Sequence, residues 1–229
     1  MGFFSDSLFF GAFISLVGYM AGAALKKRLR SDFFNPLLFA ILFVIAFLTL
    51  TKVDYDTYSK NAIYISYLLT PATICLALPL YEKRILITRN LTAIITGIFM
   101  GVISSISSVL VLSSLLGLSH LQYVTFIPKS ITTAIGMGVS EELGGMANIT
   151  AVAIIITGII GNIIAEPLCR ILKIEDPIAR GIAIGSSSHA IGTTKAMEIG
   201  ETEGAMSGLA IALAGLLTVA LAPFFANII

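Results

Sequence analysis

Long runs of apolar residues, separated by short polar segments, constrain this chain more than any other feature. The runs lie roughly at residues 8–25, 33–50, 62–80, 91–116, 121–139, 149–168, 178–199 and 205–225. A helix of about 20 mostly apolar residues spans the hydrocarbon core of a bilayer. Hydrophobic residues make up 57% of the chain and charged residues only 12%, whereas about 25% of the residues in a soluble domain are charged. The sequence therefore predicts an all-α polytopic membrane protein in contact with a lipid bilayer.

The remaining composition argues against several other classes of protein. The net charge is +1 and the basic residues are spread over short loops, so we expect no nucleic-acid partner. Cys75 and Cys169 lie in or beside apolar runs, where two buried thiols are a simpler reading than a disulfide. The N-terminus lacks a basic region, and its first apolar run ends in KKRLR rather than in a small-residue cleavage site. We therefore expect this run to be kept as a membrane helix.

No catalytic or metal-binding constellation is visible in the sequence. It contains no paired His/Cys spacing, no P-loop and no nucleophile elbow. Three serines, Ser186, Ser187 and Ser188, precede His189, but no acid is placed to orient the histidine. We therefore expect neither an enzyme nor a bound cofactor or metal.

The charges of the loops predict how the runs are oriented. The KKRLR segment at residues 26–30 and the EKR segment at residues 82–84 are expected on the cytoplasmic side, which places the N-terminus outside. The loop at residues 170–180 is basic as well. It would nevertheless lie outside if residues 121–139 crossed the membrane completely.

Two re-entrant hairpins remove this conflict. Residues 121–145 would enter from outside and return, and residues 177–204 would enter from inside and return, each hairpin being followed by a crossing helix. Opposed units of this kind form the inverted repeat that is common among secondary transporters. The predicted fold then has about six transmembrane helices plus two oppositely oriented re-entrant or broken-helix hairpins. The alternative is eight ordinary helices with one basic loop on the unexpected side.

Polar residues gather at both predicted hairpin tips. Backbone that leaves helical geometry inside a membrane must be buried in protein or line a watery cavity. Two opposed half-helix N-termini, with lysines and hydroxyl groups beside them, would suit a small organic anion. The predicted substrate-binding residues are Lys129, Ser130, Thr132 and Thr133 in the first hairpin, and Ser187, Ser188, His189, Gly192, Thr193, Thr194 and Lys195 in the second.

Several of these residues also have a purely structural explanation. Lys129 could extend to the outer interface, and Lys195 could pair with Glu198 or Glu201 close by on a helix. His189 could be a buried, hydrogen-bonded histidine, or it could relay a proton. His189 and Glu198 are the two candidates for a group that couples transport to protons.

Four motifs resemble the LrgB/CidB family of antiholin-like membrane proteins, and the resemblance covers nearly the whole chain. In chain order they read PKSITTAIGMGVSEELGG, TAVAIIITGIIG, PIARGIAIGSSSHAIGTTKAMEIGE and GAMSGLAIALAGLLT. The family pattern often has Pro after the first Thr pair and Gly after the histidine, where this chain has Ala134 and Ala190. Both departures from the family pattern fall at the predicted hairpin tips.

The resemblance implies a protein of the bacterial inner membrane that acts with a small LrgA/CidA-like subunit. The family was named for antiholin-like control of murein hydrolase export and cell lysis. A related domain forms the C-terminal half of the plastid glycolate/glycerate transporter, and bacterial relatives have been tied to the uptake or export of pyruvate.

Two functions follow as hypotheses. The first is a transporter of small monocarboxylates, with proton coupling as an option. In it, residues 1–120 form a scaffold or oligomerisation region, as a dimer or a larger homo-oligomer, and residues 121–229 form an inverted-repeat core that moves in an elevator-like manner. The second is a regulator of lysis without a substrate of its own, for which glycine-rich faces such as Gly97 and Gly101 would matter more than Lys129 or Lys195.

Overall fold

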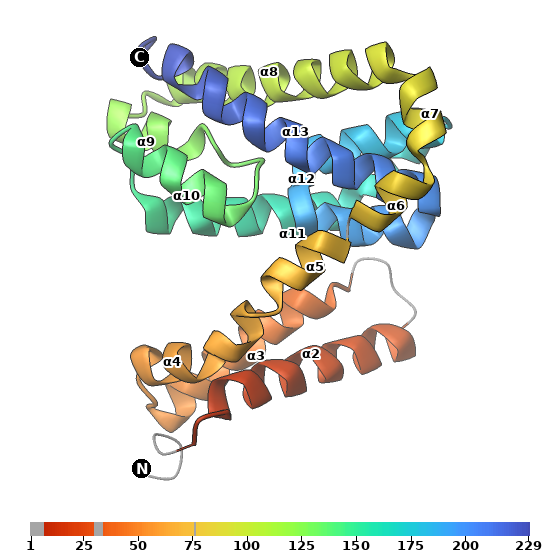
Figure 1. Ribbon diagram of the computed structural model, residues 1–229. Helices are drawn as coiled ribbons and strands as arrows, with labels where there is room; N and C mark the ends of the chain where they lie inside the picture. The colour runs from red at the N-terminus through yellow and green to blue at the C-terminus, as the bar shows by residue number, and fades with distance from the viewer. Residues whose placement is uncertain (1–6, 30–33, 76) are drawn as a thin grey trace. The chain divides into compact units, whose positions relative to one another are not determined.

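The computed structural model describes residues 7–29, 34–75 and 77–229, and this part of the chain contains helices and no strand (Figure 1). Arg30 and Phe33, which belong to the predicted basic loop and the second apolar run, lie outside the described residues. The predicted all-α class is confirmed. The chain divides into two compact units, Met1–Cys75 and Leu76–Ile229.

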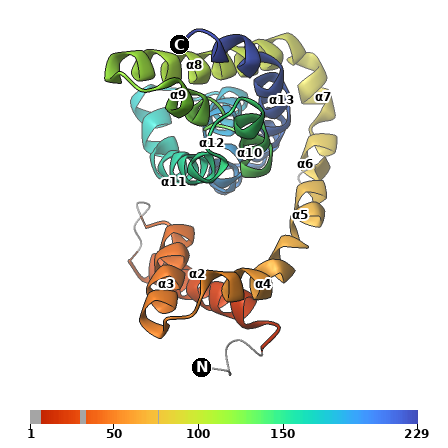
Figure 2. The ribbon, with the colours of Figure 1, turned by 90° about the vertical axis from the view of Figure 1, so that its left-hand side faces the viewer.

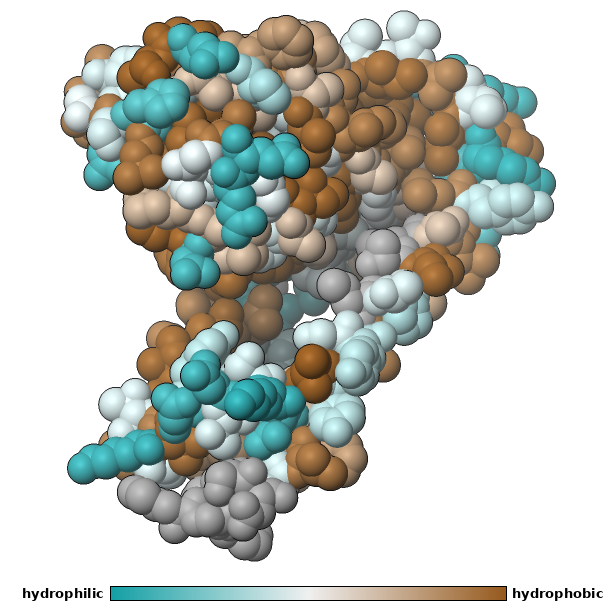
Figure 3. Space-filling view, turned by 60° about the vertical axis from the view of Figure 1, so that its left-hand side comes forward, coloured by the Kyte–Doolittle hydropathy of each residue, from teal (hydrophilic) through white to brown (hydrophobic). Residues whose placement is uncertain are grey.

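Four segments of the described chain are long and apolar enough to cross a membrane, as judged by length and composition. They are Tyr55–Glu82, Leu91–Leu116, Ala147–Ile171 and Glu201–Ala226. The helix at Pro36–Thr51 is apolar but shorter. Large apolar side chains also lie on the protein surface, among them Leu112, Leu116 and Ile160. Figure 3 shows brown, hydrophobic areas on the surface between smaller teal, hydrophilic groups. Such a surface is stable in lipid, and the chain is a polytopic membrane protein.

The first unit is built from α2 (Phe10–Leu29), α3 (Pro36–Thr51), α4 (Tyr55–Ser66) and α5 (Leu69–Cys75). Helix α3 begins where the Asn35 side chain accepts a hydrogen bond from the Leu37 N–H at 2.8 Å, with Pro36 in the first turn. Glycines on α2 allow close packing: Gly11 lies against the backbone of α4, and Gly22 lies against Pro36 of α3.

The second unit contains the two short helices α6 (Ala77–Glu82) and α7 (Arg84–Arg89), followed by the helices of the predicted hairpins and crossings. These are α8 (Leu91–Leu116), α9 (His120–Phe126), α10 (Thr133–Glu142), α11 (Ala147–Ile171), α12 (Pro177–Ile199) and α13 (Glu201–Ala226). Figure 2 shows α12 in the middle of this unit, with α8, α11 and α13 around it.

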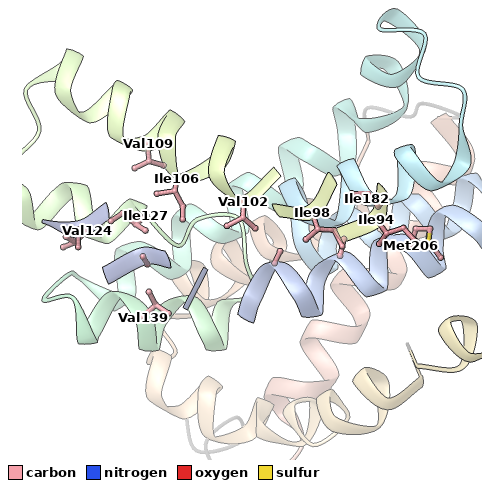
Figure 4. Close-up of a cluster of buried hydrophobic side chains, with 14 of the residues drawn as sticks. Ile94, Ile98, Val102, Ile106, Val109, Val124, Ile127, Val139, Ile182 and Met206 are labelled. Atoms are coloured by element: carbon pink, nitrogen blue, oxygen red, sulfur yellow. The ribbon is translucent and has the colours of Figure 1, made fainter. Parts of the chain in front are cut away.

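Helix α8 carries the largest apolar core of the second unit on one of its faces. Ile94, Ile98, Val102 and Ile106 recur every four residues and are 2% exposed or less. Figure 4 shows them in a row along the helix. They belong to one buried cluster with residues of α12 and α13, including Met206. This spacing turns a single stripe of α8 toward the interior.

Helix α12 is a hairpin rather than a straight helix. His189 has φ 42° and ψ −143°, which interrupts the helical backbone and divides α12 into an incoming arm (177–188) and a returning arm (190–199). Ile184 and Ala196 pack in one cluster although they lie on different arms, and a straight helix would hold them about 18 Å apart. The incoming arm runs beside α13, where Gly181 lies against Glu203 and Gly185 lies against Ser207.

Helix α12 is the second of the two predicted hairpins, and the first is formed by α9 and α10, with its tip at residues 127–132. Three buried hydroxyl groups fasten it to α11. Thr150 Oγ1 donates to the Thr125 carbonyl at 2.8 Å and hydrogen-bonds Ser140 Oγ at 2.7 Å, while Thr125 Oγ1 accepts from the Met146 N–H at 2.9 Å. Both arms of this hairpin are thereby held at the start of α11.

The two hairpin tips meet near the middle of α8. Gly97 of α8 faces Ile182 of the incoming arm of α12, and Gly101 faces Ser186. Because the residue numbers rise together along this contact, the incoming arm runs parallel to α8. The tip between α9 and α10 arrives from the other end of α8, and Ser105 Oγ donates to Ser130 Oγ at 2.8 Å. The tips thus approach one another from opposite ends of a 26-residue apolar helix. Helix α8 belongs to the second unit, and the division at residue 120 between scaffold and transport core stays a prediction.

Candidate functional site

A cavity of about 570 Å³ lies between α8, α11 and the two hairpins. Its volume is in the range of ligand-binding sites for small molecules. The first hairpin contributes its tip, and α12 contributes its incoming arm. Serines form much of the polar lining: Ser104, Ser105, Ser108, Ser130, Ser186, Ser187 and Ser188.

Lys129 supplies the positive charge of this cavity. Its Nζ donates to Ser130 Oγ at 3.2 Å. No carboxylate of the described residues lies within ion-pair distance of Lys129. A lysine inside a membrane protein normally has a partner, because a charge at the bilayer centre costs at least about 2.5 kcal/mol. The geometry therefore leaves a place for an anion beside Lys129.

The structure divides the predicted site residues into two groups. Four of them line the cavity, namely Lys129, Ser130, Ser187 and Ser188. The others are absent from its lining: Thr132, Thr133, His189, Gly192, Thr193, Thr194 and Lys195. Both helices that begin after a tip, α10 at Thr133 and the returning arm of α12, thus start outside the cavity lining. The half-helix N-termini that the sequence suggested as an anion site contribute no residue to the lining of this cavity, and their role stays a prediction.

His189 holds the tip of the second hairpin in place. Its side chain is 2% exposed, and its Nε2 hydrogen-bonds the Ile154 carbonyl of α11 at 2.9 Å. The imidazole packs on Gly158, where a Cβ would lie 2.6 Å from the ring. A positive φ is rare for a residue other than glycine and persists where surrounding contacts impose it. These contacts match the structural explanation of the buried histidine, and its role in coupling stays a prediction.

The neighbouring hydroxyl groups reinforce the same turn. Thr193 Oγ1 donates to the His189 carbonyl at 2.9 Å and also hydrogen-bonds Ser207 Oγ of α13 at 2.7 Å. Thr194 Oγ1 accepts from Asn162 Nδ2 at 3.0 Å. Gly192 lies against Ser188 of the incoming arm. These contacts fasten the returning arm to α11, α13 and the incoming arm.

Lys195 is ion-paired within the protein. Its Nζ lies 2.9 Å from Glu166 Oε2 on α11 and 3.6 Å from Glu198 Oε2. The Lys195 side chain is only 11% exposed, and Glu166 also bonds Arg170 at 3.2 Å. Glu201, the other partner considered from the sequence, instead pairs with Lys83 at 3.3 Å. The principal partner of Lys195 was not predicted, because Glu166 lies on a different helix and is distant in sequence.

A double-mutant cycle separates the two roles of Lys195. We expect Lys195→Met to lower the thermal stability of the purified protein, and Glu166→Gln in the same chain to restore part of it, with a coupling of about 0.5–3 kcal/mol. The reason is that each single change leaves one charge of the pair without its main partner, and the Lys195 side chain is only 11% exposed. Thermal unfolding in detergent measures the effect. Independent effects of the two changes, together with a loss of substrate affinity in Lys195→Met alone, would instead place Lys195 on the substrate.

The serines of α8 were not predicted as site residues. Ser104, Ser105 and Ser108 fall on adjacent turns of an otherwise apolar helix, and Gly101 lies one turn before them. Polar and small residues that share one stripe of a membrane helix are a usable signal for an interior face. The signal was lost because α8 was read as an ordinary scaffold helix.

The described residues contain no group of three or more His, Cys, Asp or Glu side chains that could hold a metal ion.

A second cavity of about 230 Å³, lined by Glu166, Cys169, Arg170, Arg180 and Ile199, lies beside the Lys195 ion pair. Its charged groups bond one another or the backbone: Arg170 bonds Glu166, and Arg180 donates to the Ile174 carbonyl at 2.5 Å.

The model of the LrgB-like family matches residues 15–228, nearly the whole chain. No solved structure is significantly similar to this one.

Proposed function

This chain belongs to the LrgB-like family, and from that premise we propose that it transports small monocarboxylates across the membrane. The observation that carries the proposal is the Lys129 ammonium in the 570 Å³ cavity, without a carboxylate of the described chain at ion-pair distance. One such cation favours a ligand with one negative charge, since a second carboxylate would bring a charge with no counterpart in the described cavity lining. The serine hydroxyls suit the remaining oxygens of a short oxyacid such as glycolate or pyruvate.

The opposed hairpins support a transport mechanism. The cavity lies where the tips meet, and its lining continues from Lys129 to Leu172 and Ile174 beyond the last turns of α11. In our proposal this end faces the cytoplasm, because the basic residues Arg170 and Lys173 lie there. An inverted repeat would then expose the site alternately to the two sides as the hairpins shift, with the N-terminus outside.

The family membership supports a membrane protein of the LrgAB/CidAB type. We propose that the chain acts in the bacterial inner membrane as a homo-oligomer, with a small LrgA/CidA-like subunit as its partner. In this mechanism the chain needs no cofactor and catalyses no reaction. Proton coupling, if present, would involve Glu198, whose side chain is 51% exposed beside Lys195, or His189.

A regulator of lysis without a substrate is the competing function. It would use glycine-rich helix faces such as Gly97 and Gly101 to contact a partner. Both glycines instead face α12 of the same chain, at Ile182 and Ser186. This intramolecular contact favours the transporter.

Uptake into proteoliposomes tests the proposal. We expect the purified chain, with or without the small subunit, to carry radiolabelled glycolate or pyruvate at a rate above that of empty liposomes. A labelled amino acid of similar size serves as the control solute. If the reconstituted chain moves neither acid, even with the small subunit present, the transporter is ruled out and the regulator gains support.

A further inference from the structure

The hydroxyl group of Ser130 has an unusual pattern of hydrogen bonds. It accepts one bond from Lys129 Nζ at 3.2 Å and another from Ser105 Oγ at 2.8 Å. A serine hydroxyl has two acceptor lone pairs and one donor hydrogen. Both lone pairs of Ser130 are thus occupied, while no acceptor for its hydrogen is present among the described residues. Ser130 is only 6% exposed and lines the cavity.

Three other cavity serines, Ser108, Ser186 and Ser187, use their hydrogens on carbonyl groups of their own helices. Ser108 Oγ donates to the Ser105 carbonyl at 2.7 Å, and Ser187 Oγ donates to the Ala183 carbonyl at 2.6 Å. Ser186 Oγ likewise donates to the Ile182 carbonyl at 2.8 Å. Each of these hydroxyl groups donates its hydrogen to a backbone carbonyl of its own helix. Ser105 differs because it donates across to the tip of the first hairpin.

We propose that Ser105 is a positioning residue that turns the Ser130 hydroxyl hydrogen toward the bound carboxylate. With its lone pairs filled by Ser105 and Lys129, the Ser130 oxygen can act on a ligand only as a donor. Lys129 has three N–H donors and uses one of them on Ser130. The two residues together therefore present only donors to the cavity.

This donor arrangement specifies the ligand group more closely than charge does. A carboxylate has two oxygens that only accept, so both can be satisfied at once by the Ser130 O–H and the Lys129 N–H groups. The corresponding carboxamide carries an NH₂ group, which donates hydrogen bonds and cannot accept one from the Ser130 O–H or the Lys129 N–H groups. The inference rests on the proposed function, since it assigns a role to Ser105 in binding the proposed substrate. It adds a specificity-determining residue on α8, which lies outside both hairpins.

The test is equilibrium binding of radiolabelled glycolate and pyruvate to the full chain in detergent. We expect Ser105→Ala to raise Kd about 3- to 10-fold, the range for losing one orienting hydrogen bond. Ser105→Thr keeps the hydroxyl and should bind like the wild type. Ser107→Ala is the matched control, because Ser107 lies on the same helix and outside the cavity lining. In Ser130→Ala, adding Ser105→Ala should change Kd no further, since Ser105 acts through Ser130.

The outcomes distinguish this inference from the proposed function. Equal Kd values for Ser105→Ala and Ser107→Ala overturn the role of Ser105, while wild-type uptake leaves the transporter standing. Binding without uptake overturns the transporter, and the Kd pattern still decides the role of Ser105. A loss in Ser105→Thr as large as in Ser105→Ala, or additive losses in the double variant, would show that Ser105 is merely structural and contradict the inference. A wild type that binds neither acid overturns both.

Discussion

Replacing Lys129 by glutamine is expected to abolish or nearly abolish the uptake of small monocarboxylates. Glutamine keeps most of the side-chain length and a donor but removes the only charge that the described cavity lining offers to an anion. Truncating one member of a desolvated charge pair typically costs about 2–5 kcal/mol, which corresponds to roughly 30-fold or more in affinity. Initial uptake rates in proteoliposomes over a range of substrate concentrations would show this as a KM raised roughly 30-fold or more, or as no measurable uptake.

Lys173→Gln is the matched control for this experiment. Lys173 has the same charge but is exposed after the end of α11 and does not line the cavity. We expect its uptake to equal that of the wild type. Uptake with an unchanged KM in Lys129→Gln would refute the assignment of Lys129 to the substrate. Lys129→Arg keeps the charge in a wider planar group, and we expect it to retain only part of the activity.

The second large effect is expected for stability, at the contact between the incoming arm of α12 and α13. A Cβ placed on Gly185 would collide with the Ser207 carbonyl oxygen and would lie 2.8 Å from Ala210 Cβ. Backbone cannot give way as a flexible side chain does, so Gly185→Ala should destabilise the protein by about 1–3 kcal/mol or more. Thermal unfolding in detergent would measure this loss.

Gly138→Ala separates close packing from helix propensity. Gly138 lies in α10, and beyond the backbone of its own helix no described atom lies within 4 Å of the place that a Cβ would take, so alanine fits there. Alanine is favoured over glycine in helices by about 1 kcal/mol, and propensity alone would predict stabilisation at both positions. We expect Gly138→Ala to be neutral or stabilising and Gly185→Ala to be strongly destabilising. Similar unfolding temperatures for the two variants would contradict the tight approach of α12 to α13.

The reversal of α12 illustrates what could be predicted from the sequence. Long apolar runs indicated membrane helices, and the polar, serine-rich stretch before His189 indicated an interruption. The loop charges around Arg170 and Arg180 suggested that the chain returns to the side from which it entered. The structure places the turn at His189. These features are local, so they are readable without knowing the neighbours of each helix.

The residues around the cavity were harder to predict. Lys195 looked like a substrate ligand because its partner, Glu166, is on a different helix and far away in sequence. The serines of α8 looked like ordinary members of an apolar helix. The stripe of serines indicates an interior face of α8, but which helices this face contacts depends on how several helices pack. For the same reason, Lys129 and Lys195 seemed equivalent until their neighbours were known.

The sequence by itself determined the class of the protein, its LrgB-like character and the two places where the chain can leave helical geometry inside a membrane. These follow from composition, run length and short motifs, which act along the chain. Only the tertiary structure decided that Lys195 is bound by a carboxylate of α11 while Lys129 opens into a cavity with Ser105 and Ser130. The physical reason is that a charge in a membrane protein is defined by its partners, and partners are brought together by packing between helices.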